Sequence, residues 1–593
     1  MNPTVEKLAL LRTALQQNGI DAYIIPLSDP HLGEYIPDHW KIIRWLTGFT
    51  GSAATVVVTD SFAGLWTDSR YFIQAERELA GSGFNLERPI PFQVSDYTGW
   101  LAENLNQGSK IGFDGRLFSI TRFRKLQKSL ERKNPVFDLE FDPVTDLWTD
   151  RPRMPFFPAW DFPVEYAGKE RSAKIDEIRK IMKNRSADYH LISSPDDIMW
   201  LLNIRGNDIS FSPLILSFAL LGETQILLFV DERKIPHGLA GDLDKHGIVT
   251  LPYEETAGMI STLSVDSSIL VSPATTSVSL YNSIPAGCKI IEDESIPTRL
   301  KAIKNKTEIE NISKVMVKDG VALTRFFYRI ENDRGVVPMT ERSVNVRLHE
   351  FRAQQEGCMG PSFATITAYN EHAALPHYSP SPETDSMIGE KGILLVDSGG
   401  QYMGGTTDIT RSVAIGIPTP GQKKDFTLVL KGHISLALSK FPLGTKGYQI
   451  DMLARKALWE NGLDYGHGTG HGVGYALNVH EGPQNISPSD NKTIIEAGML
   501  ISNEPAVYRE GEYGIRTENL MICYEDEETD FGQFLKFDTI SLCYIDKSLI
   551  DKSLLDNREI SWLNSYHTEV FEKLSPHLNE DEKLWLKEKT EPI

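Results

Sequence analysis

Residues 392–400 read Gly-Ile-Leu-Leu-Val-Asp-Ser-Gly-Gly, an apolar run that ends on the carboxylate of Asp397. A short apolar run bounded by glycines predicts a buried strand. Asp408 follows eleven residues later in Thr-Thr-Asp-Ile-Thr-Arg, after a turn around Gly404-Gly405. This spacing suits two antiparallel strands, which would set Asp397 and Asp408 side by side on one face.

Four further stretches of the C-terminal half bring histidines and acids to the ends of apolar or glycine-rich segments. Strand ends that gather such side chains are candidates for a catalytic or metal-binding site. The candidates are His467 and His471 in the Gly-His-Gly-Thr-Gly-His-Gly-Val-Gly run at 466–474, His480 in Asn-Val-His-Glu, Glu504 after the strand predicted over 499–503, and Glu518 after 514–517.

Carboxylates that converge on one buried point repel each other, and their pKa values rise unless cations neutralise them. Asp397, Asp408, Glu504 and Glu518 would form such a cluster, and two divalent ions would neutralise it. Four carboxylates and one imidazole are an oxygen-rich ligand set, which favours manganese, with zinc and cobalt as alternatives. Two metal ions lower the pKa of a water held between them, so the predicted chemistry is peptide or ester hydrolysis.

Each of these residues also has an ordinary structural explanation when it is taken alone. A single Asp or Glu at a strand end is usually a turn or cap residue, and a lone buried His is usually hydrogen-bonded in a core. Alternating glycines usually mark a tight bend, and Arg516 could pair with a surface acid. The functional interpretation therefore depends on the complete ordered set.

Composition and missing motifs exclude several classes of protein. The 593 residues carry 61 basic and 81 acidic side chains, a formal charge of −20, which argues against nucleic-acid and anionic-membrane partners. The four cysteines are scattered, so neither a disulfide framework nor a thiolate zinc site is predicted, and a reducing cytoplasm is the expected compartment. No Gly-x-Ser-x-Gly, phosphate-loop or His-Glu-x-x-His motif occurs.

The N-terminal half predicts a duplicated α/β arrangement. Helix, strand and Trp-Leu landmarks follow one another from residue 8, and the same order recurs from residue 175, with a strand expected over 214–221. Four prolines between 152 and 163 mark a boundary, and Thr307-Glu308-Ile309-Glu310 predicts a capping box that opens a long helix. The helical tail carries an apolar stripe, covered either in this subunit or by a neighbour. The expected domains are 1–155, 165–303 and 304–593.

The ordered motifs resemble those of the pita-bread metallopeptidases and, within them, of the aminopeptidase P, or Xaa-Pro aminopeptidase, family. The signature comprises Val-Asp-Ser-Gly-Gly, Thr-Thr-Asp-Ile-Thr-Arg, His-Gly-Thr-Gly-His-Gly-Val-Gly, Asn-Glu-Pro and Ile-Arg-Thr-Glu-Asn. The likeness runs from Asp21-Ala22-Tyr23 through 48–53 and 66–72 to the tail at 562–567, as in the long three-domain cytosolic form. It implies an α/β chain in which two tandem creatinase-N-like domains precede a pita-bread α+β catalytic domain.

The resemblance implies a metal-binding role for five residues. Asp408 and Glu518 would bridge two metal ions, Asp397 would bind one ion through both oxygens, and His471 and Glu504 would bind the other. Glu504 would also carry a proton from the attacking water to the leaving proline nitrogen.

Four further residues would act on the substrate or support the ligands. His377, in Leu-Pro-His-Tyr, and His480 would hydrogen-bond the scissile carbonyl and the oxyanion, and His467 would line the proline pocket. Arg516 would hold the bridging acids. Ala506 stands where the family commonly has glycine, from which we expect a slightly altered pocket wall and no loss of metal.

The expected function is that of a metal-dependent aminopeptidase that hydrolyses the N-terminal Xaa-Pro bond of short peptides by attack of a metal-bridging hydroxide. The resemblance also implies two divalent ions per subunit, preferably manganese, together with a homodimer and a cytoplasmic location. Three alternatives stay open. Prolidase cuts only Xaa-Pro dipeptides and usually has one N-terminal domain, methionine aminopeptidase is much shorter, and a non-catalytic pita-bread peptide-binding protein would have lost ligands.

Overall fold

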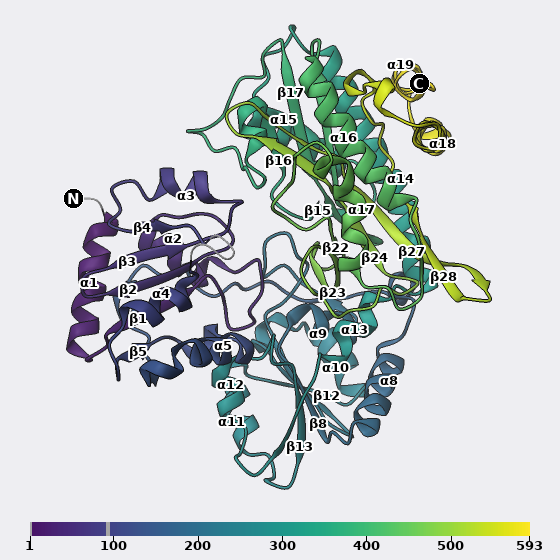
Figure 1. The fold of residues 1–593 in the computed structure, drawn as a ribbon. Helices are drawn as coiled ribbons and strands as arrows, with labels where there is room; N and C mark the ends of the chain where they lie inside the picture. Colours follow the sequence, from purple (N-terminus) through teal and green to yellow (C-terminus); the bar gives the residue numbers. More distant parts are fainter. Residues whose placement is uncertain (1–2, 90–94) are drawn as a thin grey trace. The chain divides into compact units, whose positions relative to one another are not determined.

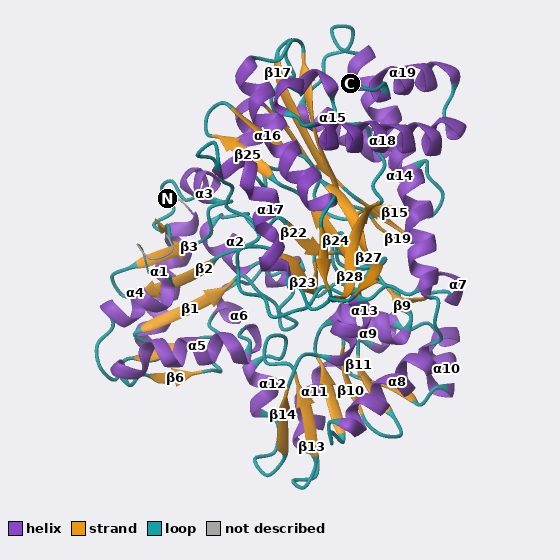
Figure 2. Cartoon of the chain, turned by 45° about the vertical axis from the view of Figure 1, so that its right-hand side comes forward, coloured by secondary structure: helices purple, strands orange, loops and turns teal. Residues whose placement is uncertain are grey.

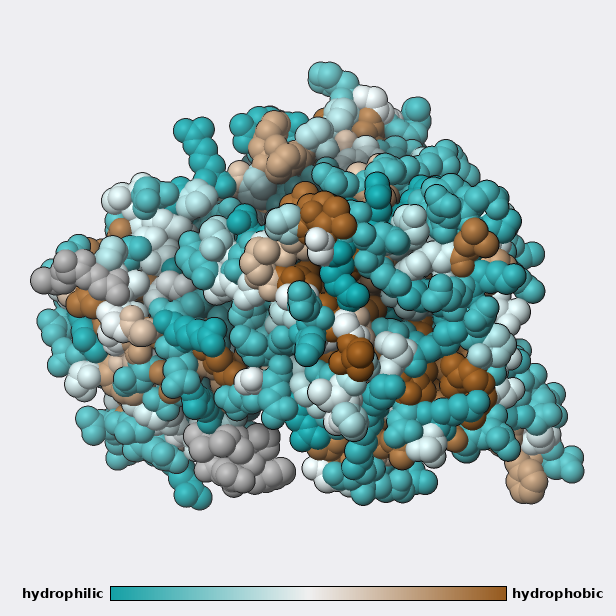
Figure 3. Space-filling view, turned by 90° about the horizontal axis from the view of Figure 1, so that it is seen from above, coloured by the Kyte–Doolittle hydropathy of each residue, from teal (hydrophilic) through white to brown (hydrophobic). Residues whose placement is uncertain are grey.

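The computed structural model describes residues 3–89 and 95–593 and divides the chain into two compact units (Figure 1). Unit 1 comprises residues 1–162 and 169–297, and unit 2 comprises residues 163–168 and 298–593. None of the described helices is long and apolar enough to cross a membrane. Figure 3 shows hydrophilic side chains over most of one face, with apolar side chains in small separate patches.

The first half of unit 1 is a six-stranded sheet covered on both faces. In sheet order its strands are β4 (Asn85–Glu87), β3 (Ala63–Trp66), β2 (Thr55–Thr59), β1 (Ala22–Pro26), β5 (Lys110–Gly112) and β6 (Val136–Asp138). Tyr23 and Ile25 share a core with α1 (Pro3–Gln17) and α2 (Ile42–Thr47), whereas Ala22 and Ile24 pack with α4 (Tyr97–Asn104) and α5 (Ile120–Leu130). Because successive side chains of a strand point to opposite faces, β1 must be apolar throughout.

The second half of unit 1 repeats this sheet. In the corresponding order its strands are β12 (Ile248–Leu251), β11 (Ile226–Phe229), β10 (Phe218–Leu221), β8 (Tyr189–Ile192), β13 (Ser268–Val271) and β14 (Lys289–Glu292), with α8 (Arg171–Asn184) and α9 (Pro195–Leu202) among its helices. Both central strands, β1 and β8, have one antiparallel and one parallel neighbour. The predicted duplication is therefore confirmed.

The prediction of a strand over 214–221 was wrong for its first half, because β10 begins only at Phe218. The backbone groups of Leu214 and Leu216 bond to Asp208 instead of to a neighbouring strand. The Asp208 backbone N–H donates to the carbonyl of Leu214 at 2.8 Å, and its carboxylate accepts from the N–H of Leu216 at 2.8 Å. An apolar run alone does not reveal this competition for backbone groups.

Unit 2 combines long helices with antiparallel sheets (Figure 2). One sheet contains β16 (Ile366–Tyr369), β17 (Gly392–Ser398) and β20 (Ile409–Ile415). A second contains, in order, β21 (Lys440–Pro442), β28 (Gly532–Thr539), β27 (Asn519–Thr529), β24 (Leu500–Asn503), β22 (Gly470–Gly472) and β23 (Glu481–Ile486). The main helices are α14 (Lys306–Asn332), α15 (Glu341–Ala353), α16 (Pro420–Ala437) and α17 (Gly447–Trp459).

The start of α14 corrects the predicted capping box. Asn305 is the N-cap and accepts from the N–H of Glu308 at 3.0 Å, while the Glu308 carboxylate accepts from the N–H of Asn305 at 2.8 Å. The box thus uses Asn305 and Glu308 in place of Thr307 and Glu310. Asn is at least as good an N-cap as Thr, so the helix begins at the earlier position.

Residues 163–168, which connect the two halves of unit 1 along the chain, are held against α14 by hydrogen bonds. They contain α7 (Val164–Ala167), which lies beside α14 in Figure 2. Asn305 Nδ2 donates to the carbonyl of Ala167 at 2.9 Å, and Asn311 Nδ2 donates to that of Glu165 at 3.0 Å. Gly168 has a φ of 68°, and a Cβ there would meet Asn305 Oδ1 at 2.3 Å, so this close approach requires glycine.

The C-terminal tail forms α18 (Asn557–Leu574) and α19 (Glu580–Thr590). Its apolar stripe is covered within the chain, because α18 packs against α14 and α16. Leu563, Val570 and Leu574 are fully buried. The sequence left open whether this stripe is covered within the subunit or by a neighbour, and the structure shows that it is covered within the subunit.

Candidate metal centre

The first two acids belong to the paired strands β17 and β20. In this antiparallel pair Asp397 is opposite Thr410. Asp408 precedes β20 and is two residues from Thr410, so in extended chain its side chain points the same way as that of Thr410. The register therefore turns Asp397 and Asp408 to the same side, with an offset along the strand.

The other two acids leave a second strand pair at one end. β24 and β27 pair with Asn503 opposite Asn519. Glu504 follows Asn503 and Glu518 precedes Asn519, so both glutamates emerge at the same edge of the sheet. His471 lies on β22, which pairs with the other side of β24. Three neighbouring strands thus deliver two carboxylates and an imidazole to one place.

The side-chain distances show that these groups meet. His471 Nε2 lies 3.4 Å from Asp408 Oδ2 and 3.6 Å from Glu504 Oε1. One potential ligand atom from each of Asp408, His471 and Glu518 lies within 4.8 Å of the other two. The site predicted from widely separated motifs is therefore a single cluster.

Arg516 ties Asp397 and Glu518 together. Its Nη2 lies 2.5 Å from Asp397 Oδ2, and its Nε donates to Thr410 Oγ1 at 3.1 Å. The Thr410 hydroxyl in turn donates to Glu518 Oε2 at 2.7 Å. Because Arg516 is buried among these groups, it is not the surface cation that its sequence also allowed.

Burial and mutual repulsion dominate the protonation of the cluster. Burial raises the pKa of Glu504 to about 7, with the charges of Asp408 and Asp397 adding to the shift and those of His471 and Arg516 opposing it. Burial also raises the pKa of Glu518 well above its usual range. Burial alone would lower the pKa of His471, but its hydrogen bond to Asp408 and the charge of Glu504 outweigh this and raise the pKa to about 9.

These residues fit divalent cations. Four buried or half-buried carboxylates face only Arg516 and His471 as partners in the contacts just described, which leaves an excess of negative charge. In addition, Asp397 Oδ1 is buried and has no hydrogen-bond donor in the part of the chain that the structure describes. Buried carboxylate oxygens without donors are what hard metal ions bind.

Comparison with known proteins identifies related families over almost the whole chain. Residues 310–525 match metallopeptidase family M24 and residues 533–593 its C-terminal region, while residues 7–150 and 150–308 each match a creatinase/prolidase N-terminal domain. A probable Xaa-Pro aminopeptidase P of Laccaria bicolor is 36% identical, with 100% of this chain and 94% of that protein covered. Xaa-Pro aminopeptidase 1 of Dictyostelium discoideum is 38% identical, with 99% and 96% covered.

A solved structure agrees with these relatives. It is the X-prolyl aminopeptidase of Caenorhabditis elegans, described as a cytosolic enzyme with a di-nuclear active site; it is 35% identical, has a TM-score of 0.96 and covers 100% of both chains. The chain belongs to the Xaa-Pro aminopeptidase branch of metallopeptidase family M24. The predicted fold, with two creatinase-N domains before a pita-bread domain, is confirmed.

Two of the three other histidines that match the family's motifs lie at the cluster. The ring of His480 stands edge-on to that of His471, with 4.4 Å between the centroids. His467 Nε2 lies 2.9 Å from the hydroxyl of Tyr508, which also accepts from Arg516 Nη1 at 2.7 Å. A chain of hydrogen bonds therefore runs from His467 through Tyr508 and Arg516 to the cluster.

His377 lies on the loop between the 3-10 helix η6 (Asn370–Ala374) and β17, and a buried glutamate organises this loop. Glu341, the first residue of α15, is fully buried, and its carboxylate accepts from Tyr378 Oη at 2.8 Å, from Ser386 N at 3.1 Å and from Tyr369 N at 2.7 Å. Tyr378 directly follows His377. This role of Glu341 is not visible in the sequence, because nothing local distinguishes it from any other helix-opening acid.

A buried ion triad beside His480 is also not visible in the sequence. Glu481 Oε1 lies 2.5 Å from Lys304 Nζ, and Glu481 Oε2 lies 3.4 Å from Lys301 Nζ. All three side chains are buried. The triad anchors the residue after His480 to the segment that leads into α14. Two lysines three residues apart normally indicate a solvated helix face, so only the tertiary structure reveals this role.

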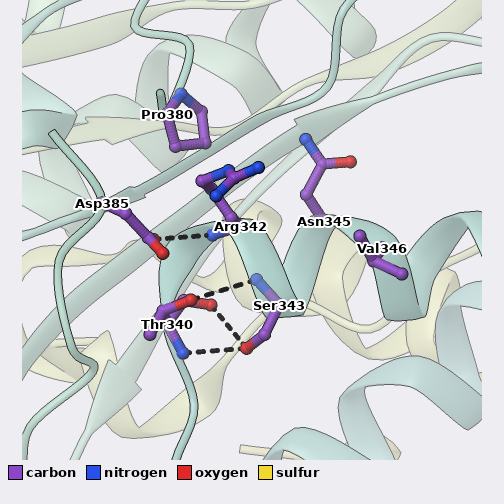
Figure 4. Close-up of a pocket in the computed structure, with 7 residues that line it drawn as sticks. All are labelled: Thr340, Arg342, Ser343, Asn345, Val346, Pro380 and Asp385. Carbon is purple, nitrogen blue, oxygen red and sulfur yellow. Dashed lines mark hydrogen bonds between the residues drawn. The ribbon is translucent and has the colours of Figure 1, made fainter. Parts of the chain in front are cut away.

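A pocket of about 480 Å³ opens at the start of α15, and its lining shares no residue with the cluster (Figure 4). Thr340 is the N-cap of α15 and exchanges hydrogen bonds with Ser343, and the N–H of Arg342 donates to Asp385 at 3.0 Å. None of the predicted site residues lines it, so it adds no group to the candidate chemistry. The lining residues are Thr340, Arg342, Ser343, Asn345, Val346, Pro380 and Asp385.

Proposed function

We propose that this chain is a metal-dependent aminopeptidase that hydrolyses the bond between an N-terminal residue and a following proline in short peptides. The observation that carries the proposal is the five-residue cluster, which supplies uncompensated carboxylates in a chain whose full-length relatives are named Xaa-Pro aminopeptidases. The Xaa-Pro bond has no N–H and proline has a fixed φ, so an extended-peptide cleft fits it poorly. A dedicated pocket is needed.

The metal ligands in this proposal are Asp397, Asp408, His471, Glu504 and Glu518, with two divalent ions between them. Asp408 and Glu518 would bridge the ions. Manganese is preferred because four of the five ligands are carboxylates, and zinc and cobalt are alternatives. When bound, the ions would supply a water of lowered pKa and polarise the scissile carbonyl.

The other groups of the chain handle protons and orientation. We assign Glu504 to carry a proton from the attacking water to the leaving proline nitrogen. We assign His377 and His480 to hydrogen-bond the scissile carbonyl and the developing oxyanion, and His467, which contacts Tyr508, to the wall of the proline pocket. Arg516 orients Asp397 and, through Thr410, Glu518.

We propose domain borders at 1–155, 165–303 and 304–593. The family matches at 7–150, 150–308, 310–525 and 533–593 support three domains in this order. The second match starts at residue 150, which is 15 residues before the proposed second domain, and residues 163–168 and 298–303 pack with unit 2. We also propose a cytoplasmic location, which the four free cysteines support.

A homodimer is the proposed assembly. With the tail covered within the chain, support for it comes from α17, where Tyr448, Met452 and Trp459 are 38%, 50% and 49% exposed. Three large apolar side chains on one exposed helix are typical of an interaction surface. Sedimentation equilibrium should give a dimer for the wild type and a monomer for Met452→Glu; a monomeric wild type would refute the proposal.

The decisive experiment compares two substrates. Release of the first residue is measured from an Xaa-Pro-Xaa tripeptide and an Xaa-Pro dipeptide, with chelator and with added manganese. We expect manganese-dependent cleavage of the tripeptide. A strong preference for the dipeptide would identify a prolidase, and no metal-dependent cleavage of either peptide would refute the enzymatic function.

A further inference from the structure

Behind the candidate metal centre, on the side of the C-terminal tail, five buried polar residues form a hub. Each comes from a different element: β20, α16, β24, β27 and α18. All are almost completely shielded from solvent, and two of them, Asn503 and Asn519, directly adjoin the ligands Glu504 and Glu518. The hub comprises Arg411, His433, Asn503, Asn519 and Tyr566.

Arg411 is the centre of the hub. Its Nη1 donates to the carbonyl of Glu518 at 2.7 Å and to that of Thr410 at 2.9 Å. Its Nε donates to the carbonyl of Tyr544 at 2.9 Å, and its Nη2 donates to Tyr566 Oη at 2.8 Å. One guanidinium therefore joins the backbone of a proposed metal ligand to the C-terminal tail.

His433 fixes the two strands that carry the glutamates. Asn519 Nδ2 donates to His433 Nε2 at 3.1 Å, which leaves the proton on Nδ1 to donate to the carbonyl of Asn503 at 3.1 Å. Asn503 Nδ2 donates back to the carbonyl of His433 at 2.9 Å. Since Asn503 and Asn519 are opposite each other in the sheet, α16 holds both strands at the point where the ligands emerge.

Tyr566 connects the hub to α18. Its hydroxyl accepts from Arg411 and lies 2.9 Å from the carbonyl of Cys543 and 3.0 Å from that of Ser541. Its ring stacks on Trp562 at 5.2 Å with the planes only 3° apart. Arg411 Nη2 also donates to Asn519 Oδ1 and to the carbonyl of Cys543, both at 2.8 Å, so Tyr566 is one of its three acceptors. Loss of the Tyr566 hydroxyl would remove one acceptor from a buried guanidinium, which favours a shift of Arg411 toward the remaining acceptors.

The contacts extend to the ligand carboxylate itself. Thr410, whose carbonyl accepts from Arg411, donates its hydroxyl to Glu518 Oε2 at 2.7 Å. A displaced Arg411 would therefore move both the backbone and the carboxylate of Glu518. Outer partners of metal ligands commonly change metal affinity by 10- to 100-fold when they are removed.

We propose that helix α18 sets the metal affinity of the centre, with Tyr566 and Arg411 as positioning residues. The inference rests on the proposed function, because it assumes that Glu518 binds metal. The tail is thus part of the metal-binding machinery, although it supplies no ligand.

The test is Tyr566→Phe, which keeps the ring and its stacking on Trp562 and removes only the hydroxyl. Manganese affinity is measured by calorimetry on the chelator-stripped full chain, and the melting temperature of the metal-free protein is measured in parallel. We expect roughly 10-fold weaker manganese binding, and excess manganese should restore kcat to within about 2-fold of the wild type.

The matched control is Glu559→Gln, which removes an ion pair of 2.7 Å between α18 and Lys431 of α16 and leaves the hub intact. It should keep wild-type manganese affinity. Unchanged affinity in Tyr566→Phe, or an equal loss in both variants, would overturn the proposal. If Tyr566→Phe does not fold, Arg411→Lys is the alternative variant, because it keeps the positive charge and loses the several N–H donors of the guanidinium. It should also weaken manganese binding, and unchanged affinity in it would overturn the proposal. A wild type that binds no manganese would refute the proposed function itself, and the inference with it.

Discussion

Unit 1 and the metal centre of unit 2 bury charge in opposite ways. In unit 1, Lys234 Nζ lies 2.6 Å from Asp208 Oδ2, and both side chains are almost fully buried. The Asp208 carboxylate also accepts from backbone N–H groups. In unit 2, four carboxylates share Arg516 and His471. One region neutralises its buried charge with its own side chains, and the other leaves negative charge for a ligand to neutralise.

This difference separates stability from activity. A buried pair that is complete contributes to a single native structure, and breaking it destabilises the protein. An incomplete cluster destabilises the metal-free protein and stabilises it again when cations bind, by an amount that depends on their concentration. Substitutions in the two regions should therefore have opposite signatures.

The largest effect should come from Asp408→Asn in unit 2. We expect kcat to fall by roughly 10³-fold or more, because the substitution removes a bridging ligand. The melting temperature of the metal-free protein should change little, because the lost repulsion between carboxylates is offset by the lost attraction to protonated His471. Tripeptide kinetics and differential scanning calorimetry measure both quantities. Full activity in this variant would contradict the bridging role.

The opposite signature is expected for Asp208→Asn in unit 1. It leaves Lys234 buried without its counter-ion, which typically costs about 3–5 kcal/mol of unfolding free energy. The folded protein should keep its kcat/KM, because neither residue is part of the proposed site. Urea unfolding and tripeptide kinetics on the same preparation test this. A stable variant with lost activity would reverse the comparison.

Manganese should act on unit 2 alone. Added to chelator-stripped protein at about 100 times its dissociation constant, it should stabilise the catalytic unit by about 2.7 kcal/mol. Hydrogen exchange followed by peptide mapping would separate the units. Protection should increase in β20, β24 and β27 and stay constant in β1 and β8. Equal protection in both units would mean that the ion binds elsewhere.

The unfolding free energy of the metal-free protein should depend on pH through the metal centre of unit 2. The pKa of His471 is about 9 in the folded state, against an ordinary value of 6.5. The stabilisation by its proton is fully present below pH 6.5 and is lost as pH rises through 9, by up to about 3 kcal/mol. Bound metal should abolish this dependence, because a ligating imidazole is already neutral. Urea midpoints at pH 6.5 and 9, with and without manganese, measure it.

The smallest effect should come from Ala506→Gly. Ala506 is buried on β25 (Ala506–Arg509), opposite Arg516 on β26 (Tyr513–Arg516), and it holds no ligand. Metal affinity should not change, and stability should fall by about 1 kcal/mol or less. A shift in KM for substrates with different residues after the proline would show that the methyl group shapes the pocket wall.

The cluster could be predicted because its members sit in short local motifs. Asp397 and Glu504 each end an apolar strand, and His471 lies in a glycine-rich run, so each motif is visible without tertiary information. The duplication was visible for the same reason, since apolar strands recur in the same order. Local patterns failed where two signals competed, as with Asn305 and Thr307 at the start of α14.

The supporting residues could not be predicted, because their roles exist only between distant segments. Glu341 and Tyr378 are 37 residues apart, and Arg411 and Tyr566 are 155 apart. Neither Glu341 nor Arg411 stands in a pattern that separates a buried partner from a solvated charge. Burial of a long polar side chain is decided by which segments pack over it.

The fastening of α7 to α14 has a consequence for dissecting this protein. Because residues 163–168 belong to unit 2 although the chain enters unit 1 again after them, the catalytic unit is not encoded as one uninterrupted stretch. A fragment starting at residue 298 would lack the strap that Asn305 and Asn311 hold. Expression of the isolated catalytic unit should therefore need residues 163–168 grafted ahead of it, and recombination between relatives at the second junction alone would split a structural unit.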